Sequence, residues 1–507
     1  MKNLKIYFTS DLHGYIYPTD YTNKDLKNIG LLNIINSYDK DENTLIIDSG
    51  DTIQGSPFTT YLSKTNFSFH PIAKIMNEGK YDFVTLGNHD FNYGYNYLKS
   101  YINNLDATCI CANVVDKTNQ INIKPYSIKT LGNGLKIGLI GFTTDYINVW
   151  EQKENLTNFE INDTFENVKK YHDELKNKVD ILIGVYHGGF ENDIKSGRSL
   201  SSTSENIAYK IAKYLNFDIL LTGHQHMEIE GFNLFNTYIV QTPQNGSKYI
   251  ELNAEIEDNV IKSINSNLII PKINPNKKMY NELLNIENDV QKWLDTPVGF
   301  LDCPLNPESH IKMALEGSNL ANFINQVQLE KSNADISCTS FANVIKGFNK
   351  SVTVRDIVST YVYPNTLVVL NITSEILKKA LFRCSQYFAI ENNKIKVSNL
   401  FLEPKVEHYN YDYFSNIEYE FDLSKEGLDR VSNIKFKGKD IKDTDTFKLV
   451  MNNYRASGTG GYEFFKDCPI EKDIQTEMTE IIIDYFTKHK NVVVDKTKYI
   501  NIKKIKD

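Results

Sequence analysis

The sequence lacks several features that would place it in a special class of protein. No apolar run approaches the ~20 residues that a membrane-spanning helix needs, so no membrane partner is expected. Six cysteines among 507 residues are too few for a disulfide framework, which favours reduced thiols. Basic residues are not in excess, because 56 Lys and Arg stand against 64 Asp and Glu, for a net charge of −8. Binding of long nucleic acid is therefore not expected, whereas a local cationic site could still hold a small anionic substrate.

The amino-terminal segment gives no sign of a secretory leader. The run from Met1 to Ser10 is too short to hold a signal peptide before ordered structure begins. Together with the scarce cysteine, this favours a cytoplasmic location. An exported protein whose leader had been trimmed would look the same, and the sequence makes no prediction of the oligomeric state.

About the first 270 residues alternate short apolar runs with stretches of helical periodicity. The apolar runs are rich in Ile, Val and Leu, and they predict buried strands at Leu4–Phe8, Leu45–Ile47, Phe83–Leu86, Leu135–Ile140, Ile181–Val185 and Ile219–Leu221. The stretches between them predict helices at Phe165–Leu175 and Glu205–Tyr214. This alternation predicts a layered α/β domain over residues 1–273, with its chemistry at the strand ends.

Two further segments complete the predicted organisation. A charged stretch with an apolar stripe, closed by Thr296-Pro297, predicts a linker helix over residues 274–296. Residues 297–507 mix strands such as Thr366–Ile372 with helices such as Ser374–Arg383, which predicts a second α/β domain.

Most predicted strands of the first domain are followed by side chains that can bind a metal. These side chains are Asp11, His13, Asp51, Asn88, His187, His224 and His226. Carboxylate, imidazole and amide groups suit divalent first-row metals such as Mn, Zn, Fe or Co, and the lack of thiolates argues against a structural zinc site. On a continuing strand Asp11 and His13 would share one face. His224 and His226 would do so only if their strand continues, and in a turn they could face different ions.

Seven ligands are too many for one tetrahedral ion and predict two ions that share a carboxylate. Two divalent ions and the carboxylates of Asp11 and Asp51 leave a pocket charge of about +2, with the ions ~3.5–4 Å apart. Such a centre would attract a phosphate group and lower the pKa of a bound water. Each short motif alone is more often a turn or a helix cap, so the prediction depends on five of them in order.

These five motifs, in this order, resemble the signature of the calcineurin-like metallophosphoesterase superfamily. The resemblance implies a β-sandwich with flanking helices, in which one ion is held by Asp11, His13, Asp51 and His226, and the other by Asp51, Asn88, His187 and His224. It also implies that His89 contacts the substrate phosphate and assists the leaving oxygen. Histidine suits that role because it titrates near neutral pH. A supporting hydrogen-bond donor is the alternative role for His89.

The second domain resembles the C-terminal domain of the 5′-nucleotidase family, and within it the bifunctional 2′,3′-cyclic-nucleotide 2′-phosphodiesterase/3′-nucleotidases. The resemblance rests on the stretches 361–367, 410–414, 451–458 and 460–462. It implies that rings at Tyr411 and Tyr454 enclose the nucleobase, and stacking is worth about 1–3 kcal/mol per base. Asn365 and Arg355 are further candidates for substrate contact, although a surface ion pair is an equal alternative for Arg355.

Three departures from the 5′-nucleotidase pattern bear on the substrate. The segment Cys338–Asn343 has no arginine where many members of that family bind phosphate. The carboxylate that pairs with the catalytic histidine in those enzymes is replaced by Asn92, with Asp90 as a possible substitute. An acidic base-binding position falls at Gly460. Together these departures weaken the 5′-nucleotidase interpretation.

The sequence therefore predicts a two-domain, two-metal phosphohydrolase. The resemblance favours hydrolysis of 2′,3′-cyclic nucleotides to 3′-nucleotides, and of these to nucleosides. One alternative is a 5′-nucleotidase or UDP-sugar hydrolase. Another, from a different class, is a catalytically silent interaction module with the metallophosphoesterase fold.

Overall fold

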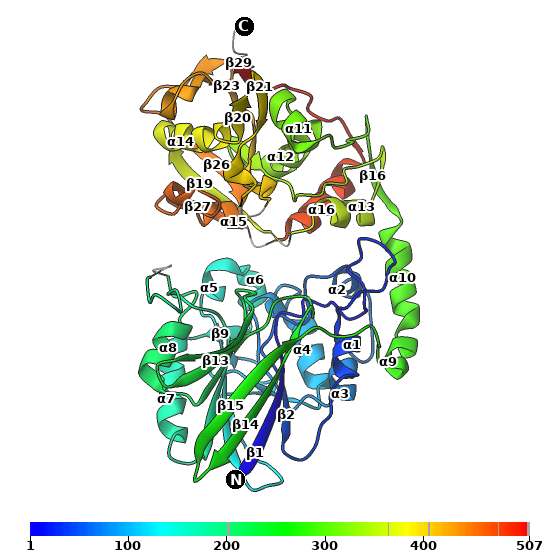
Figure 1. Cartoon of the computed structure of the whole chain (residues 1–507). Coiled ribbons are helices and arrows are strands. Elements are labelled where there is room, and N and C mark those ends of the chain that lie inside the picture. Colours follow the sequence, from blue (N-terminus) through cyan, green and yellow to red (C-terminus); the bar gives the residue numbers. More distant parts are fainter. Residues whose placement is uncertain (200–202, 364, 404–405, 475, 504–507) are drawn as a thin grey trace. The chain divides into compact units, whose positions relative to one another are not determined.

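The computed structural model describes residues 1–199, 203–363, 365–403, 406–474 and 476–503. They form two compact units, residues 1–291 and residues 292–507 (Figure 1). Pro364, in the motif stretch 361–367, lies outside the described residues. Over the part of the chain that is described, no helix is both long enough and apolar enough to cross a bilayer.

Unit 1 is built on two large β-sheets, beside a small sheet of β5 (Val114–Asp116) and β9 (Phe159–Ile161). Within the described residues, one sheet has the strand order β15 (Val260–Ile269), β14 (Tyr249–Glu257), β1 (Lys2–Thr9), β2 (Thr44–Asp48), β3 (Phe83–Val84), β4 (Thr108–Ile110) and β6 (Ile123–Lys124). The other has the order β12 (Ile229–Leu234), β13 (Thr237–Gln241), β11 (Ile219–Thr222), β10 (Ile181–His187), β8 (Lys136–Thr143) and β7 (Tyr126–Thr130). All six strands predicted for this unit are present.

The apolar side chains of both sheets form one core. Ile6 and Leu45 of the first sheet pack in the same cluster as Ile137, Ile183 and Leu221 of the second. Strands buried on both faces read as continuous apolar runs, which is why the runs in the sequence located them. The predicted β-sandwich is therefore confirmed.

A second core lies on the outer face of the β10 sheet, under helices α7 (Thr164–Leu175) and α8 (Ala208–Leu215) (Figure 1). Helix α7 matches its predicted range, but α8 begins three residues later than predicted. The side chains of Glu205 and Asn206, which were predicted as helical, instead make contacts with neighbouring loops. The Asn206 Oδ1 atom accepts a hydrogen bond from the Gly189 amide at 2.7 Å, and the Glu205 carboxylate contacts His224.

The central strands of both sheets run parallel and end level with one another. Thr9 of β1 lies beside Asp48 of β2, and Asp48 lies beside Val84 of β3. In the second sheet, Tyr186 of β10 lies beside Thr222 of β11. The loops that follow these strands therefore leave the sandwich at one edge, where parallel folds position their functional groups.

The segment predicted as a single linker helix forms two helices, α9 (Lys277–Glu282) and α10 (Leu284–Leu294), interrupted at Leu283. Its first part packs on unit 1. The Tyr17 hydroxyl donates to the Tyr280 carbonyl at 2.8 Å, and the Tyr21 hydroxyl donates to Glu287 at 3.3 Å.

Unit 2 is centred on a mixed sheet. Among the described residues its order is β22 (Tyr413–Ser415), β17 (Ile336–Thr339), β26 (Thr446–Asn452), β19 (Leu367–Thr373) and β27 (Ile470–Ile474). Helices α12 (Asn319–Ser332), α14 (Ser374–Ser385) and α16 (Met478–His489) carry buried apolar residues against this unit's core. The predicted strand Thr366–Ile372 and helix Ser374–Arg383 correspond to β19 and α14, so the second α/β domain is confirmed.

Candidate metal centre

The seven predicted ligands lie at the shared edge of the two sheets, six of them on loops and His187 as the last residue of β10, and the backbone is strained at most of them. Five have positive φ angles, which non-glycine residues rarely adopt: Asp11 (54°), His13 (46°), Asp51 (54°), His224 (70°) and His226 (56°). Such strain persists where the surrounding fold enforces it, and it clusters at functional sites. Asp11 and His13 therefore reach the site from a loop after β1, and not by alternation along a continuing strand.

The first cluster consists of Asp11, His13 and His226, each of which offers a ligand atom within 4.8 Å of the others. The His226 Nε2 atom lies 3.4 Å from Asp11 Oδ1, and 3.2 Å from His13 Nε2. Two imidazole nitrogens and a carboxylate facing one another at this distance form a typical donor set for a transition metal.

The second cluster consists of Asp51, His187 and His224, again with ligand atoms within 4.8 Å of one another. The Asp51 Oδ2 atom lies 3.1 Å from His187 Nε2 and 3.9 Å from His13 Nε2, so Asp51 lies between the two clusters. The Asn88 Oδ1 atom is 3.2 Å from His187 Nε2. Strand β11 ends at Thr222, and the turn after it sends His224 and His226 to different clusters, which was the second of the two predicted possibilities.

Backbone carbonyls orient two of the histidines. The Nδ1 atom of His187 donates to the Ser49 carbonyl at 2.8 Å, and Nδ1 of His13 donates to the Gln54 carbonyl at 3.1 Å. Because a carbonyl only accepts, the proton is fixed on Nδ1 and the Nε2 lone pair faces the clusters. This arrangement is typical of metal-binding histidines.

The charges of the site require a cation. Asp11 and Asp51 are almost completely buried, and buried carboxylates are stable only beside compensating positive charge. Burial opposes ionisation, but the hydrogen bond from His226 and the nearby imidazoles hold the pKa of Asp11 below its usual range. Burial would also lower the pKa of His187, but the charge of Asp51 raises it to about 10. Without a metal ion the His187 imidazolium therefore balances that carboxylate, and a bound cation would replace its Nε2 proton. Burial lowers the pKa of His13 to about 4, which favours the neutral form that binds metals. The donor set and its charge therefore fit divalent metals.

Close backbone packing makes Gly87 necessary at this site. A Cβ atom at Gly87 would lie 2.1 Å from the Asp51 Oδ1 atom and 2.3 Å from the Asp51 amide nitrogen. Any larger residue would displace the aspartate that lies between the clusters.

His89 lies beside both clusters, at the start of the 3₁₀ turn η1 (His89–Phe91). Its amide donates to Asp51 Oδ1 at 2.7 Å, and its ring centroid is 5.4 Å from that of His13. Its Nδ1 atom lies 2.8 Å from Asn92 Oδ1. The residue that supports the His89 ring is therefore Asn92.

Asp90 has a different task. Its carboxylate accepts hydrogen bonds from four backbone amides, those of Asp51, Thr52, Ile53 and Gly87, at 2.8–3.1 Å. Asp90 therefore holds the Asp51 loop against the Gly87 loop. It does not take the place of the carboxylate that pairs with the catalytic histidine in 5′-nucleotidases, because its hydrogen bonds go to these backbone amides.

One acidic residue of the site was not predicted. Glu205, on the long loop before α8, places its Oε1 atom 3.1 Å from His224 Nε2. A carboxylate behind a ligand histidine fixes the orientation of the ring and raises its basicity. No motif marks Glu205, because it is joined to His224 only through the fold.

The predicted aromatic pair of unit 2 requires a correction. Tyr454, on α15 (Asn453–Ala456), is 40% exposed, but Tyr411 is 2% exposed and packs against Tyr387 and Tyr413 with ring centroids 4.8 and 4.9 Å apart. Tyr411 therefore lacks the open face that stacking requires. The ring next to Tyr454 is that of the half-buried Tyr409, at 6.5 Å between centroids. Period-2 alternation would place Tyr409 and Tyr411 on the same side, so the sequence held no signal for this difference. The 3₁₀ turn η3 (His408–Asn410), which is capped by Tyr411, separates the two rings.

A buried ion pair joins the two motif stretches that carry these rings. Arg455 and Asp412 are each 1% exposed, with 2.7 Å between Nε and Oδ2. The Arg455 guanidinium also donates to the carbonyls of Thr459 at 2.6 Å and Tyr409 at 3.0 Å. Gly460 belongs to the same packing, since a Cβ there would lie 2.5 Å from the Arg455 Nη1 atom. The motifs thus hold the loops that present Tyr409 and Tyr454.

The two remaining candidates have structural partners. Arg355, on α13 (Val354–Thr360), pairs with Asp295 at 2.6 Å, the alternative that the sequence left open. The backbone N–H of Asn365 donates to the Tyr363 carbonyl at 2.8 Å, and the backbone carbonyl of Asn365 accepts from the Met478 backbone N–H at 2.9 Å. Contact of either residue with a substrate stays a prediction.

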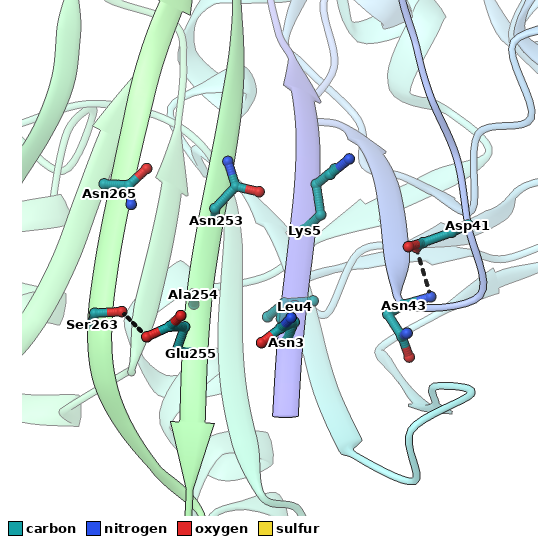
Figure 2. Close-up of a pocket in the computed structure, with 10 residues that line it drawn as sticks. All are labelled: Asn3, Leu4, Lys5, Asp41, Asn43, Asn253, Ala254, Glu255, Ser263 and Asn265. Atoms are coloured by element: carbon teal, nitrogen blue, oxygen red, sulfur yellow. Dashed lines mark hydrogen bonds between the residues drawn. The ribbon is translucent and has the colours of Figure 1, made fainter. Parts of the chain in front are cut away.

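A hollow of about 280 Å³ lies on unit 1 away from these loops (Figure 2). It is formed by the amino-terminal part of β1, the loop before β2 and strands β14 and β15, with Lys5, Asn253 and Glu255 among its lining residues. None of the predicted site residues lines it. The predicted metal ligands lie instead at the carboxyl ends of the parallel strands.

Comparison with known families agrees with this division. Residues 4–228 match the family model described as calcineurin-like phosphoesterase, and residues 298–467 match the 5′-nucleotidase C-terminal domain. The fold and the site are those of a metal-dependent phosphoesterase, which is a hydrolase. The predictions of the family and of an enzyme are confirmed.

A protein of Staphylococcus aureus, whose crystal structure was determined as a candidate 5′-nucleotidase, is 32% identical to this chain. The two structures superpose with a TM-score of 0.75 over 99% of this chain and 100% of that one. The chain therefore belongs to the 5′-nucleotidase family, with its amino-terminal calcineurin-like phosphoesterase domain.

More distant relatives carry more specific names. A 2′,3′-cyclic-nucleotide 2′-phosphodiesterase/3′-nucleotidase of Yersinia enterocolitica is 24% identical over 90% of this chain and 82% of its own length. The trifunctional nucleotide phosphoesterase YfkN of Bacillus subtilis is 27% identical over 97% of this chain, which spans 38% of that protein's length.

Proposed function

We propose that this protein is a two-metal nucleotide phosphohydrolase that converts 2′,3′-cyclic nucleotides to 3′-nucleotides and these to nucleosides. The observation that carries the proposal is the convergence of two buried carboxylates, four imidazoles and an amide at the carboxyl ends of five strands around Asp51. One ion would be held by Asp11, His13, Asp51 and His226, and the other by Asp51, Asn88, His187 and His224. When bound, the ions supply Lewis-acid activation of the phosphoryl group and lower the pKa of a bound water.

The residues around the ions have separate tasks in this reaction. Asp51 keeps the two clusters in register, and the Nδ1 hydrogen bonds of His13 and His187 keep their Nε2 atoms turned inward. His89 is the general acid. As water oxygen bonds to phosphorus and the bond from phosphorus to the ribose oxygen breaks, the proton of the His89 imidazolium passes to that ribose oxygen. One proton of the water passes to solvent, the other stays with the oxygen that is now part of the phosphate product, and solvent returns a proton to His89.

Three substrates assayed side by side test the proposal. We expect the metal-loaded protein to hydrolyse 2′,3′-cyclic AMP and 3′-AMP faster than 5′-AMP. A preference for 5′-AMP would replace the substrate assignment by that of a 5′-nucleotidase. If all three remain intact while the protein retains its ions, the interaction module would be the better interpretation. Metal analysis of the same preparation identifies the ions, which Asp, His and Asn ligation does not distinguish.

Replacing Asp51 by asparagine should remove bound metal. The amide keeps the size of the side chain but loses the charge that both clusters share, so we expect the variant to lose about one ion equivalent or more per chain after dialysis. Elemental analysis measures the loss. Asp116→Asn is the matched control, because Asp116 is also buried in unit 1 but holds a turn away from the clusters. Equal metal content in both variants would contradict the assignment of Asp51.

Tyr454 is expected to stack on the nucleobase. Because a stacked base contributes about 1–3 kcal/mol, Tyr454→Ala should raise the KM for 3′-AMP by about 5- to 150-fold with a smaller change in kcat. Tyr409→Ala should act in the same direction. Tyr214, which is 61% exposed on α8, provides the control substitution. An unchanged KM in both the Tyr454 and Tyr409 variants would show that the base binds elsewhere.

A further inference from the structure

The support of the His89 ring continues beyond Asn92. Asn92 caps the η1 turn, where its backbone N–H donates to the His89 backbone carbonyl at 3.2 Å. Its side-chain Oδ1 atom lies 2.8 Å from His89 Nδ1. Asparagine is a neutral acceptor, so it cannot stabilise an imidazolium as a carboxylate does. It can also rotate its amide by half a turn and present a donor instead. Something must therefore fix its direction.

Glu151 is placed to do this. The Asn92 Nδ2 atom donates to Glu151 Oε2, on the segment that follows α5 (Ile147–Trp150). The other carboxylate oxygen, Oε1, accepts from Asn155 Nδ2 at 2.8 Å and from the Gln152 amide at 2.7 Å. Asn155 Nδ2 also donates to the backbone carbonyl of Asn92 at 3.1 Å, so two hydrogen bonds join the two segments.

The donor and the acceptor of each hydrogen bond in the series Glu151–Asn92–His89 follow from the chemistry of the three side chains. A carboxylate only accepts, so the NH₂ group of Asn92 must face Glu151 and its Oδ1 atom must face His89. An amide oxygen also only accepts, so His89 Nδ1 must carry a proton. The proton that His89 exchanges with a leaving oxygen then belongs to Nε2.

We propose that Glu151 is a positioning residue for His89, acting through the amide of Asn92. The inference rests on the proposed function, since it assumes that His89 donates a proton to the substrate. Glu151 sets the direction of the amide, and its negative charge polarises the amide so that Oδ1 becomes a better acceptor for an imidazolium. Asp90 does not compete for this role, because its oxygens are used by backbone amides.

The substitution Glu151→Gln tests the inference. Glutamine keeps the shape but can donate as well as accept, so the Asn92 amide is no longer held in one direction. We expect kcat to fall about 10- to 100-fold, the effect of losing a hydrogen bond to a charged group, with little change in KM. Glu154→Gln is the matched control, because Glu154 is exposed on the next helical turn, α6 (Lys153–Leu156), and should leave kcat unchanged.

A double variant separates positioning from general structural support. In Asn92→Asp/Glu151→Gln, an aspartate accepts from His89 directly and a glutamine can donate to that aspartate. We expect this variant to recover most of the kcat lost in Glu151→Gln. A double variant as slow as Glu151→Gln, or full kcat in Glu151→Gln alone, would overturn the inference.

A spectroscopic readout keeps the inference independent of the substrate. In zinc-loaded protein labelled with ¹⁵N-histidine, His89→Ala identifies the His89 signals, and Nδ1 should be the protonated nitrogen of the neutral ring. Glu151→Gln should shift these signals toward a mixture of tautomers, and unchanged signals would overturn the inference. If none of the three nucleotides is hydrolysed, the proposed function fails, whereas the tautomer result is unaffected.

Discussion

Replacing His89 by alanine should slow turnover about 10²- to 10⁴-fold, the usual contribution of a positioned general acid. The reason is that a leaving ribose oxygen needs a proton. His89 lies beside the metal clusters without being one of the seven predicted ligands, and Asn92 orients its ring. Steady-state kinetics on 3′-AMP would measure the effect. Metal content should be unchanged, because the contact of His89 with Asp51 is made by its backbone amide.

The control for this variant is His489→Ala. His489 is a partly exposed histidine on α16 that pairs with Glu330 in unit 2. Full activity of the His89 variant with its ions in place would rule out the general-acid assignment and favour the supporting role. Loss of ions together with activity would instead show that His89 is needed to build the centre.

Replacing Asp412 by alanine should destabilise unit 2 by about 3–5 kcal/mol, the cost of leaving a buried charge without its partner. Arg455 would lose the carboxylate 2.7 Å from its Nε atom while remaining 1% exposed. We also expect the KM for 3′-AMP to rise, because Arg455 is bonded to the Tyr409 carbonyl. Differential scanning calorimetry would show a lower melting temperature for the transition of unit 2.

Two further variants sharpen this prediction. Asp467→Ala removes an exposed aspartate of the same unit and should leave the transition in place. The double variant Asp412→Leu/Arg455→Met replaces both charges by apolar groups and should recover part of the lost stability, because a buried pair is often replaceable by apolar packing. If Asp412→Ala melts like Asp467→Ala, the ion pair makes no net contribution.

The sequence predicted the fold of unit 1 and its metal clusters well, for a physical reason. Strands buried on both faces are continuous apolar runs, and the ligands follow them directly at ends that the parallel register brings together. Order along the chain was therefore enough to gather Asp11, Asp51 and His187. The assignment of His224 and His226 to separate clusters needed the structure, because it depends on where β11 ends and how the next turn folds.

The residues that the sequence missed act through contacts between distant segments. Glu151 is 59 positions from Asn92, and Glu205 reaches His224 from a loop of its own. The error at Tyr411 has a different origin. The stretch 410–414 was interpreted as a binding motif, but its Tyr411 and Asp412 are buried, and the half-buried Tyr409 directly precedes it. A motif can mark the support of a site as readily as the site itself.

The left-handed backbone at five of the ligands sets a limit on how this protein can be improved. Each non-glycine residue in that conformation costs about 1–2 kcal/mol, so glycine or asparagine would be easier to accommodate at His13, His224 or His226. Selection for thermal stability alone should therefore enrich such replacements and yield variants that are more stable but have lost their metal ligands and their activity. Any screen for hardier variants would have to reward turnover at the same time.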